Sequence, residues 1–588
     1  MKLRVLFSSV FCLAAVLIAL GGAGLYLGSS KAQAQPGAES AAVTANSANG
    51  PDIVRLVGPV CVNTDVRDLP YIPSTPQILK RPLTGYTPAT TGALMTETSP
   101  FAKLAALLTG ILRPVPMMPL PLLTFEGTSS LEGGQSVPPP DTNGDVGPNH
   151  YVQAVNQAFK IFDKNGNTLS GPTTFNSFFA PLGTGTPCGL SEHKTDPFVF
   201  YDQIADRWVI TDQAQDYAQT TFQECIGVSQ TGDPVAGGWC LYTLQDDTNP
   251  RVAGDYPKYG LWPDAYYLTM NKWDGVRVYA LDRASMIGGG PTNAVGFTIV
   301  ARSLRSLVPA SFRTGAPPPA GRQEFLLAID NPDPGVTETH VEGWLFHVDF
   351  INPANSTLGS DAAHHPNAQI TVNGFVNVYR DIVPQQGTTE KLDSLCDRIM
   401  TPVVYQNLNG TESLWADHTI FLNYPVGPTA IRWYQFDVTG GTFPATPVQQ
   451  QDWTNGNDGL WRWMPSIAVD ENGNAAIGYS TSSASMFPGI RYAGRFATDP
   501  LNNLGQGEAI MTNGAGSQTN GMGRWGDYTM TTVDPADGLS FWHTNEYYLT
   551  TSDGNWSTRV GRFQFSTPSR PNPTPRPRPT PAPRPTPP

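Results

Sequence analysis

Short apolar runs separated by turn residues dominate the chain from residue 141 onward. Val, Ile, Tyr, Phe and Trp fill the runs, and Asp, Asn and Gly divide them. This pattern predicts strands joined by hairpins. One hairpin recurs as strand, Asp, turn and strand, and because an Asp carboxylate accepts backbone N–H bonds within a turn, we expect its acids to be structural. They are Asp163, Asp202, Asp470 and Asp534.

Grouping these strands gives repeated units with room for three or four strands each. The units span 196–245, 255–310, 323–376, 398–446, 460–511 and 524–565. Their spacing predicts an all-β fold, a single β-propeller over 141–565 with seven blades, or six as the alternative. A pair of β-sandwiches is the competing fold. We expect the leftover segment 150–169 to close the ring by pairing with the strand-like segment 556–565.

The two ends of the chain differ from this body. Lys2 and Arg4 precede an apolar run over 5–27, and Ala32 and Ala34 offer small residues for cleavage. Residues 1–34 are therefore predicted to be a signal peptide, although the run is long enough for an uncleaved membrane anchor. The body is then secreted or held at the cell surface, outside the cytoplasm.

Proline marks two further segments. Residues 35–140 are rich in Pro and Thr and are predicted to be an irregular lead with one short helix at 99–112. Residues 566–588 carry Pro at alternate positions, together with Arg and Thr, and predict a disordered, extended tail.

Composition narrows the possible partners. The chain has 58 Gly, 55 Pro and only 14% charged residues, which argues against a mostly helical protein. Its formal net charge of -13 opposes binding to nucleic acid. Membrane contact is expected only if the N-terminal segment is uncleaved, and we expect a monomer.

Five cysteines remain after the predicted cleavage. They are Cys61, Cys188, Cys225, Cys240 and Cys396. An odd number leaves at least one thiol free or intermolecular. Cys225 and Cys240 lie in two strand-like runs separated by a turn sequence, which predicts a disulfide across that hairpin.

Three units open with a Trp beside a turn and polar neighbours. If these strings begin the innermost strands, they line one mouth of the channel with indoles, arginines and carboxylates, a mixture that binds sugars or peptides. Alternatively, each Trp fills the wedge between two blades. The candidate ligand-binding residues are Trp262, Asp264, Arg462, Trp463, Arg524, Trp525 and Asp527.

Asp141, Asn143 and Asp145 place oxygen-bearing side chains at alternate positions, as calcium loops do. The twelfth position of this loop is Val152 rather than Glu, so it is no EF-hand. A calcium site completed by distant ligands and a plain Asp/Asn turn are both open. We expect no other cofactor.

Several longer strings resemble a known family. They include PPDTNGDVGPNHYVQAVN, DYPKYGLWPDAYYLTMN, RWMPSIAVDENGNAAIGYS and RWGDYTMTTVDPADGLSFWHTNEYY. The chain resembles, over about 138–565, a largely uncharacterised family of exported bacterial β-propellers, which implies an extracellular propeller without an assigned activity. A more distant similarity to sialidase-like propellers implies catalytic acids, a Tyr and an Arg. The candidates are Asp264, Asp527, Glu546, Tyr547 and Arg524.

Three functions follow from these observations. The first is a noncatalytic exported propeller that binds an extracellular glycan, peptide or protein through its channel mouth. The second is a sialidase-like or other carbohydrate-active glycoside hydrolase. The third is a structural component of the cell surface.

Overall fold

The computed structural model describes the body of the chain and parts of the lead. The described residues are 50–73, 117–132, 139–190, 194–216, 221–245, 254–272, 275–301, 304, 306–329, 336–376, 381–456, 458–519, 521 and 523–566. The predicted signal peptide, the predicted helix at 99–112 and the tail after 566 lie outside them. Within the described residues, no helix has the length and apolar character needed to cross a membrane.

The first two sheets contain the hairpins predicted at Asp163 and Asp202. One has the order β4 (Asn143–Val146), β5 (His150–Val155), β6 (Ala158–Asp163), β7 (Thr168–Thr174). It is followed by α2 (Phe175–Phe179) and η2 (Ala180–Leu182). The other has the order β2 (Val57–Val62), β11 (Trp239–Gln245), β10 (Phe222–Ser229), β9 (Arg207–Gln215), β8 (Lys194–Asp202). A short 3-10 helix, η1 (Val66–Asp68), follows β2.

The middle of the chain forms a five-stranded and a nine-stranded sheet. The five-stranded order is β1 (Asp52–Arg55), β15 (Asn293–Ile299), β14 (Gly275–Asp282), β13 (Ala265–Lys272), β12 (Asp255–Leu261), with α3 (Arg283–Ile287) after β14. The nine-stranded sheet joins β16 (Val308–Gly315), β17 (Glu324–Ala328), β18 (Thr337–His347), β19 (Thr357–Leu358) and β20 (Ala368–Val376) to β23 (Val403–Leu408), β24 (Thr411–Phe421), β25 (Thr429–Asp437) and β26 (Gln449–Trp453). In the sequence, η3 (Pro353–Asn355) lies between β18 and β19, and the hairpin of β21 (Asp381–Pro384) and β22 (Lys391–Asp393) lies between β20 and β23.

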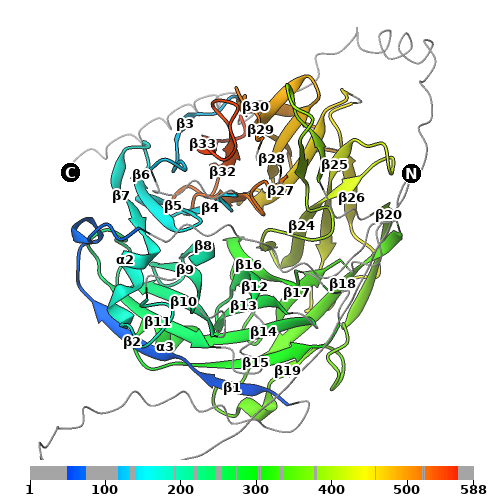
Figure 1. The fold of residues 1–588 in the computed structure, drawn as a ribbon. Helices are drawn as coiled ribbons and strands as arrows, with labels where there is room; N and C mark the ends of the chain where they lie inside the picture. Colours follow the sequence, from blue (N-terminus) through cyan, green and yellow to red (C-terminus); the bar gives the residue numbers. More distant parts are fainter. Residues whose placement is uncertain are drawn as a thin grey trace, which may run out of the picture. The chain divides into compact units, whose positions relative to one another are not determined.

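Two four-stranded sheets end the body. The first has the order β27 (Trp461–Val469), β28 (Ala475–Ser483), β29 (Met486–Arg495), β30 (Glu508–Thr512). The second has the order β3 (Leu123–Glu126), β33 (Ser557–Phe563), β32 (Phe541–Tyr547), β31 (Met530–Val533). Figure 1 follows the sheets from cyan through green and yellow to red.

The Asp turns have the structural role predicted for them. Asp163 accepts hydrogen bonds from the backbone N–H groups of Asn165 (2.8 Å) and Asn167 (2.9 Å). Asp470 repeats this pattern with two Asn residues of its own turn, both at 2.9 Å. The carboxylates therefore stabilise the tips of hairpins.

One strand of each four- or five-stranded sheet, and two of the nine-stranded sheet, surround a common cavity. Its volume is about 60 Å³, and its walls come from β4, β8, β12, β16, β23, β27 and β31. The contacts between these strands lead from β4 round to β31 and back to β4. Val199 N donates to Asn143 Oδ1 and Tyr201 N to Asp145 Oδ2, both at 2.7 Å, so β4 and β8 run in the same direction. Because the cavity holds only a few waters, no sugar fits inside it.

Apolar side chains fill the spaces between neighbouring sheets. Phe178 and Trp208 belong to a cluster shared by the sheets of β4 and β8, and Tyr259 and Tyr266 belong to one shared by the sheets of β8 and β12. Most sheets are therefore covered on both faces. This explains the many apolar runs and the small share of charged residues.

The structure corrects two expectations, one about the lead and one about how the ring of strands closes. Segment 150–169 forms β5 and β6 inside their own sheet, so its predicted pairing with 556–565 is wrong. The partner of β33 is β3, an antiparallel strand from the lead. The lead is also not irregular throughout, because β1 and β2 extend two sheets at their outer edges. These short strands lack the alternation by which the others were recognised.

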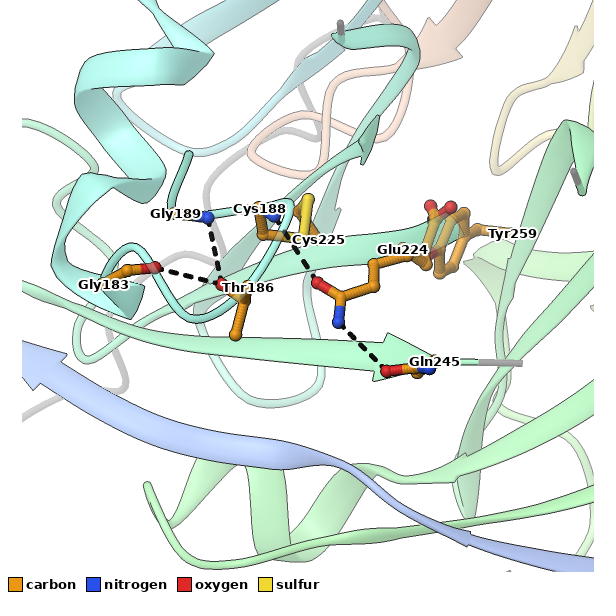
Figure 2. Close-up of a disulfide and its surroundings, with 9 residues drawn as sticks. Gly183, Thr186, Cys188, Gly189, Glu224, Cys225, Gln245 and Tyr259 are labelled. Carbon is orange, nitrogen blue, oxygen red and sulfur yellow. Dashed lines mark hydrogen bonds between the residues drawn. A yellow bond between two sulfur atoms is a disulfide. The ribbon is translucent and has the colours of Figure 1, made fainter. Parts of the chain in front are cut away.

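The predicted disulfide between Cys225 and Cys240 is also wrong. The register of β10 and β11 sets Cys225 opposite Thr243 and Cys240 opposite Val228. An offset of three residues separates the two Cα atoms by roughly 10 Å, too far for a disulfide. Cys240 instead faces Cys61 on β2 and bonds to it, while Cys188 bonds to Cys225 (Figure 2).

The odd cysteine is accounted for within the described residues. Cys396 is the free thiol there, as the cysteine count predicted, and it is buried. Both disulfides are of the kind that forms in an oxidising compartment.

Removing either disulfide is expected to lower the free energy of unfolding, by different amounts. The Cys61–Cys240 bond closes 179 residues and the Cys188–Cys225 bond closes 37. From the entropy of the closed loops, the largest expected losses of unfolding free energy are about 5 and about 4 kcal/mol, respectively. Urea unfolding of the two double serine variants measures both losses, and each variant serves as the size-matched control for the other. Equal stability of both variants and the wild-type protein would contradict the prediction.

Candidate functional site

Ionisable side chains gather where the inner strands begin. We call this group the start cluster and define it as Asp141, Asp196, Lys258, Asp527 and Glu546. Asp141 precedes β4, Asp196 and Lys258 lie in β8 and β12, Asp527 precedes β31 and Glu546 lies in β32. All five are buried. They come from segments of the chain that are far apart in the sequence.

Backbone bulges bring part of this cluster together. Asp141, Asp196, Tyr256 and Met464 have φ angles of 48°, 54°, 60° and 52°, in the left-handed region that residues other than Gly rarely adopt. Pro follows directly at 197, 257 and 465, and the ladder shifts register beside each of these prolines. Such bulges re-aim side chains and are frequent next to functional sites.

Hydrogen bonds connect the carboxyl groups across sheets. Asp141 accepts from the backbone N–H of Asp527 through Oδ1 (2.7 Å) and from Asn156 Nδ2 through Oδ2 (2.7 Å). Asn156 Oδ1 accepts in turn from the backbone N–H of Asp196 (3.0 Å). One network therefore joins the first, second and last sheets.

Lys258 lies between two aromatic rings. Its Nζ is 3.6 Å from the ring centre of Tyr256 and 3.9 Å from that of Tyr528, and it makes no hydrogen bond to the described residues. Burial lowers the pKa of Lys258 to about 7, although the Asp196, Asp527 and Asp141 carboxylates oppose the shift. The cation is thus stabilised by ring faces and by nearby negative charge rather than by a direct ion pair.

The carboxyl groups of the cluster differ in their ionisation. Burial raises the pKa of Glu546 to about 8, and its Oε2 accepts from the backbone N–H of Gly526 (2.7 Å). Burial and the neighbouring Asp527 raise the pKa of Asp141 to about 7. Arg524 forms an ion pair with Asp527 (2.8 Å). A neutral acid, Glu546, and an ion-paired carboxylate, Asp527, therefore lie close together. Gly526 lies beside Glu546, and a Cβ atom added to Gly526 would be only 3.3 Å from Glu546 Oε2.

A segment that we call the cap, residues 381–400, lies over the cluster. Its residues Leu392, Leu395 and Met400 pack with Trp525 and Tyr528. Arg398 places its guanidinium 4.8 Å from the Tyr256 ring centre and pairs with Asp397 (2.8 Å). Asp393 N donates to Gly523 O (2.7 Å). The cap separates the start cluster from solvent.

Asp145 and Asn143 lie further along β4, and their oxygens bind backbone N–H groups of β8. Asp145 also pairs with Arg313. The described residues contain no group of three or more His, Cys, Asp or Glu side chains that could hold a metal ion. A calcium loop was predicted because oxygen-bearing side chains stand at alternate positions. A strand that presents such side chains to a neighbouring strand has the same two-residue period as a calcium loop.

The predicted aromatic mouth is only partly present. Trp463 and Trp525 lie near the start cluster, with ring centres 5.8 Å apart, but both are fully buried. Trp262 and Asp264 follow β12, so they lie at its opposite end from Tyr256, roughly 20 Å away. Trp262 packs between sheets against Tyr405, as the alternative interpretation predicted.

The remaining candidates lie apart from the cluster. Arg462 is buried in its own sheet and pairs with Asp458 and Glu508. Tyr547 points to the other face of β32 from Glu546, where its hydroxyl donates to Glu126. Arg524, Asp527 and Glu546 were thus predicted together from the sequence, whereas Asp196 and Lys258 were not predicted. The X-Pro step near the start of β8 and of β12 was the available signal.

These features describe an all-β protein with a buried ionisable cluster at one end of a ring of strands. No family model matches the chain, and no curated protein sequence does.

Solved structures similar to the chain include the GH43 endo-arabinanase from Bacillus licheniformis, at 13% identity over 50% of this chain and 93% of that one, with a TM-score of 0.25. The Dos1 propeller is 7% identical over 70% and 75%, with a TM-score of 0.32. The Trypanosoma rangeli sialidase is 8% identical over 63% and 55%, with a TM-score of 0.30. Likeness at this level carries no argument about ligand or reaction.

Proposed function

We propose that the protein is an exported, seven-bladed β-propeller that binds a glycan at the start cluster and hydrolyses a glycosidic bond there. The observation that carries the proposal is the neutral Glu546 carboxyl beside the Asp527 carboxylate, which Arg524 holds. Seven strands around one cavity support the blade number. The two disulfides support an extracytoplasmic location, which recovery of a mature chain beginning after Ala34 from the medium would test.

The proposed chemistry divides the work between two carboxyl groups. Glu546 protonates the glycosidic oxygen, since burial keeps its proton in place at neutral pH. Asp527 supplies negative charge on the other side, either to the sugar carbon or to a water molecule. Asp141 and Lys258 hold that charge in position. Because the cap covers all of these groups, the substrate enters only when the cap moves.

Noncatalytic binding of a glycan, peptide or protein is the second candidate. The observation in its favour is that the cap covers the cluster. In addition, both carboxyl oxygens of Asp141 already accept hydrogen bonds from protein groups. A protein that only binds at this mouth has no need to expose its carboxyl groups.

Substitution of the two carboxyl groups separates these candidates. We expect Glu546→Gln and Asp527→Asn to lower the hydrolysis rate at least 100-fold on a panel of oligosaccharides, since removing an acid or base costs about that factor. Asp264→Asn, at an exposed turn away from the cluster, is the matched control and keeps full activity. Thermal unfolding verifies that each variant is folded.

Binding and hydrolysis assays on the wild-type protein distinguish the remaining possibilities. Glycan binding on an array without any hydrolysis contradicts the enzyme and supports the second candidate. Neither binding nor hydrolysis across glycan and peptide arrays contradicts both and leaves a structural role at the cell surface.

A further inference from the structure

A second concave site lies at the outer edge of the first sheet, away from the start cluster. It is a groove of about 360 Å³ between the η1 segment and β7. Its walls are Val66, Arg67, Leu69, Pro70 and Tyr71 on one side and residues 168–174 on the other. That volume lies within the range of small-molecule sites and accommodates a short oligosaccharide.

The side chains of the groove combine an aromatic ring with hydroxyl groups. Tyr71 is 54% exposed although it lines the groove. Ser170 is 6% exposed, and its hydroxyl is buried without a hydrogen-bond partner. Because that hydroxyl is closed off from the groove, Ser170 only shapes the wall, and the hydroxyl that a ligand can reach is that of Thr168, which is exposed. Thr168 and Thr173 line the same wall.

The charge of the groove favours a neutral ligand. Arg67 is the charged residue in its lining, and its guanidinium is already paired with Asp65. The paired guanidinium retains N–H groups that can donate to hydroxyl oxygens. The protein as a whole carries a formal net charge of -13, which disfavours anionic ligands such as nucleic acid.

The backbone of β7 argues against an added peptide strand. Pro172 has no N–H to donate to a neighbouring strand. The pairing of β7 with β6 also shifts register twice, beside Phe159 and beside Ile161, so the outer edge of β7 is not a regular ladder. Extended peptides need such a ladder to bind by strand addition.

We propose that this groove binds a neutral oligosaccharide, with a sugar ring on Tyr71 and sugar hydroxyls on Thr168 and Arg67. Tyr71 offers an apolar face beside polar groups, the combination that amphipathic sugar rings require. The site is separate from the start cluster, so it would anchor the protein to a polysaccharide whether or not the cluster is catalytic.

Isothermal titration calorimetry with neutral tetrasaccharides of glucose, xylose, arabinose, galactose and mannose tests the proposal. We expect at least one to bind the full chain, and Tyr71→Ala to weaken that binding at least 10-fold. Thr168→Val should weaken it less. Tyr424→Ala is the matched control, since Tyr424 is 49% exposed elsewhere. Glu546→Gln reports separately on binding at the start cluster.

Three results would overturn the proposal. They are no binding of any tetrasaccharide, equal binding by Tyr71→Ala and the wild-type protein, and loss of binding in Glu546→Gln alone, which would place the sugar at the start cluster. Binding of extended peptides, but of no saccharide, at Tyr71 would also reject it.

Discussion

Raising the pH from 5 to 9 is expected to lower the free energy of unfolding by several kcal/mol. Glu224 is buried on β10, where it accepts a hydrogen bond from Tyr259 (2.8 Å; Figure 2), and burial raises its pKa from 4.5 to about 8. The folded state therefore holds this proton more tightly than the unfolded state. Its contribution is fully present below pH 4.5 and is lost as the pH rises through 8. Glu546 behaves in the same way.

Other groups oppose this trend in separate pH windows. Lys258, with a pKa lowered to about 7, binds its proton less tightly in the folded state, so its share of stability grows from pH 7 to 10.5. Burial lowers the pKa of His418 and His543 to about 3, so their share is lost as the pH falls below 6.5. We therefore expect maximal stability on the acid side of neutrality.

Urea unfolding across this pH range measures the effect, and Glu224→Gln isolates one group. A shift of about 3.5 pKa units corresponds to roughly 5 kcal/mol at most. The variant should match the wild-type protein near pH 5 and exceed its stability at pH 9. Glu471→Gln, at an exposed turn, is the matched control. If Glu224→Gln and the wild-type protein lose stability equally toward pH 9, the Glu224 carboxyl is not the cause.

Arg313→Met is expected to destabilise the protein by about 3–5 kcal/mol, the cost of removing one partner of a buried ion pair. Arg313 lies on β16 and pairs with Asp145 on β4. It also donates to the backbone carbonyls of Val533 (2.8 Å), Tyr201 (3.2 Å) and Val146 (2.7 Å). One side chain thus joins four of the strands that line the central cavity.

A double-mutant cycle tests the ion-pair part of this loss. Asp145→Asn added to Arg313→Met should recover part of the stability, because it removes the carboxylate that was left unpaired. Arg559→Met is the matched control, since Arg559 pairs with the exposed Glu126 and its loss should cost less than about 1 kcal/mol. Equal losses for Arg313→Met and Arg559→Met would contradict the assigned role.

Local interactions were predictable from the sequence. The turns at Asp163 and Asp470 were identified because the carboxylate and its N–H partners are at most four residues apart. Arg524, Asp527 and Glu546 were found together because they lie in two adjoining segments. The cysteine count gave a free thiol correctly, but the pairing depends on strand register, which the sequence does not display.

Long-range interactions were not predictable in this way. Asp196 and Lys258 reach the start cluster from two separate sheets. Asp196 lies within one bulge and Lys258 directly after another, and no alternation of side chains reveals either bulge. Trp262 and Asp264 were assigned to the same mouth as Trp525 because their strings look alike. The seven residues of β12 separate Trp262 and Asp264 from the end of the strand at which Trp525 lies.

The pairing of β3 with β33 has a consequence for the order in which the protein folds. Thr558 Oγ1 donates to Thr128 O across 430 residues of chain, and such high contact order makes a step slow. β3 leaves the ribosome early and has no partner until the last strand has emerged. Until then β3 exposes unpaired edges, which are templates for aggregation. Keeping the chain unfolded until β33 has been synthesised would remove that hazard.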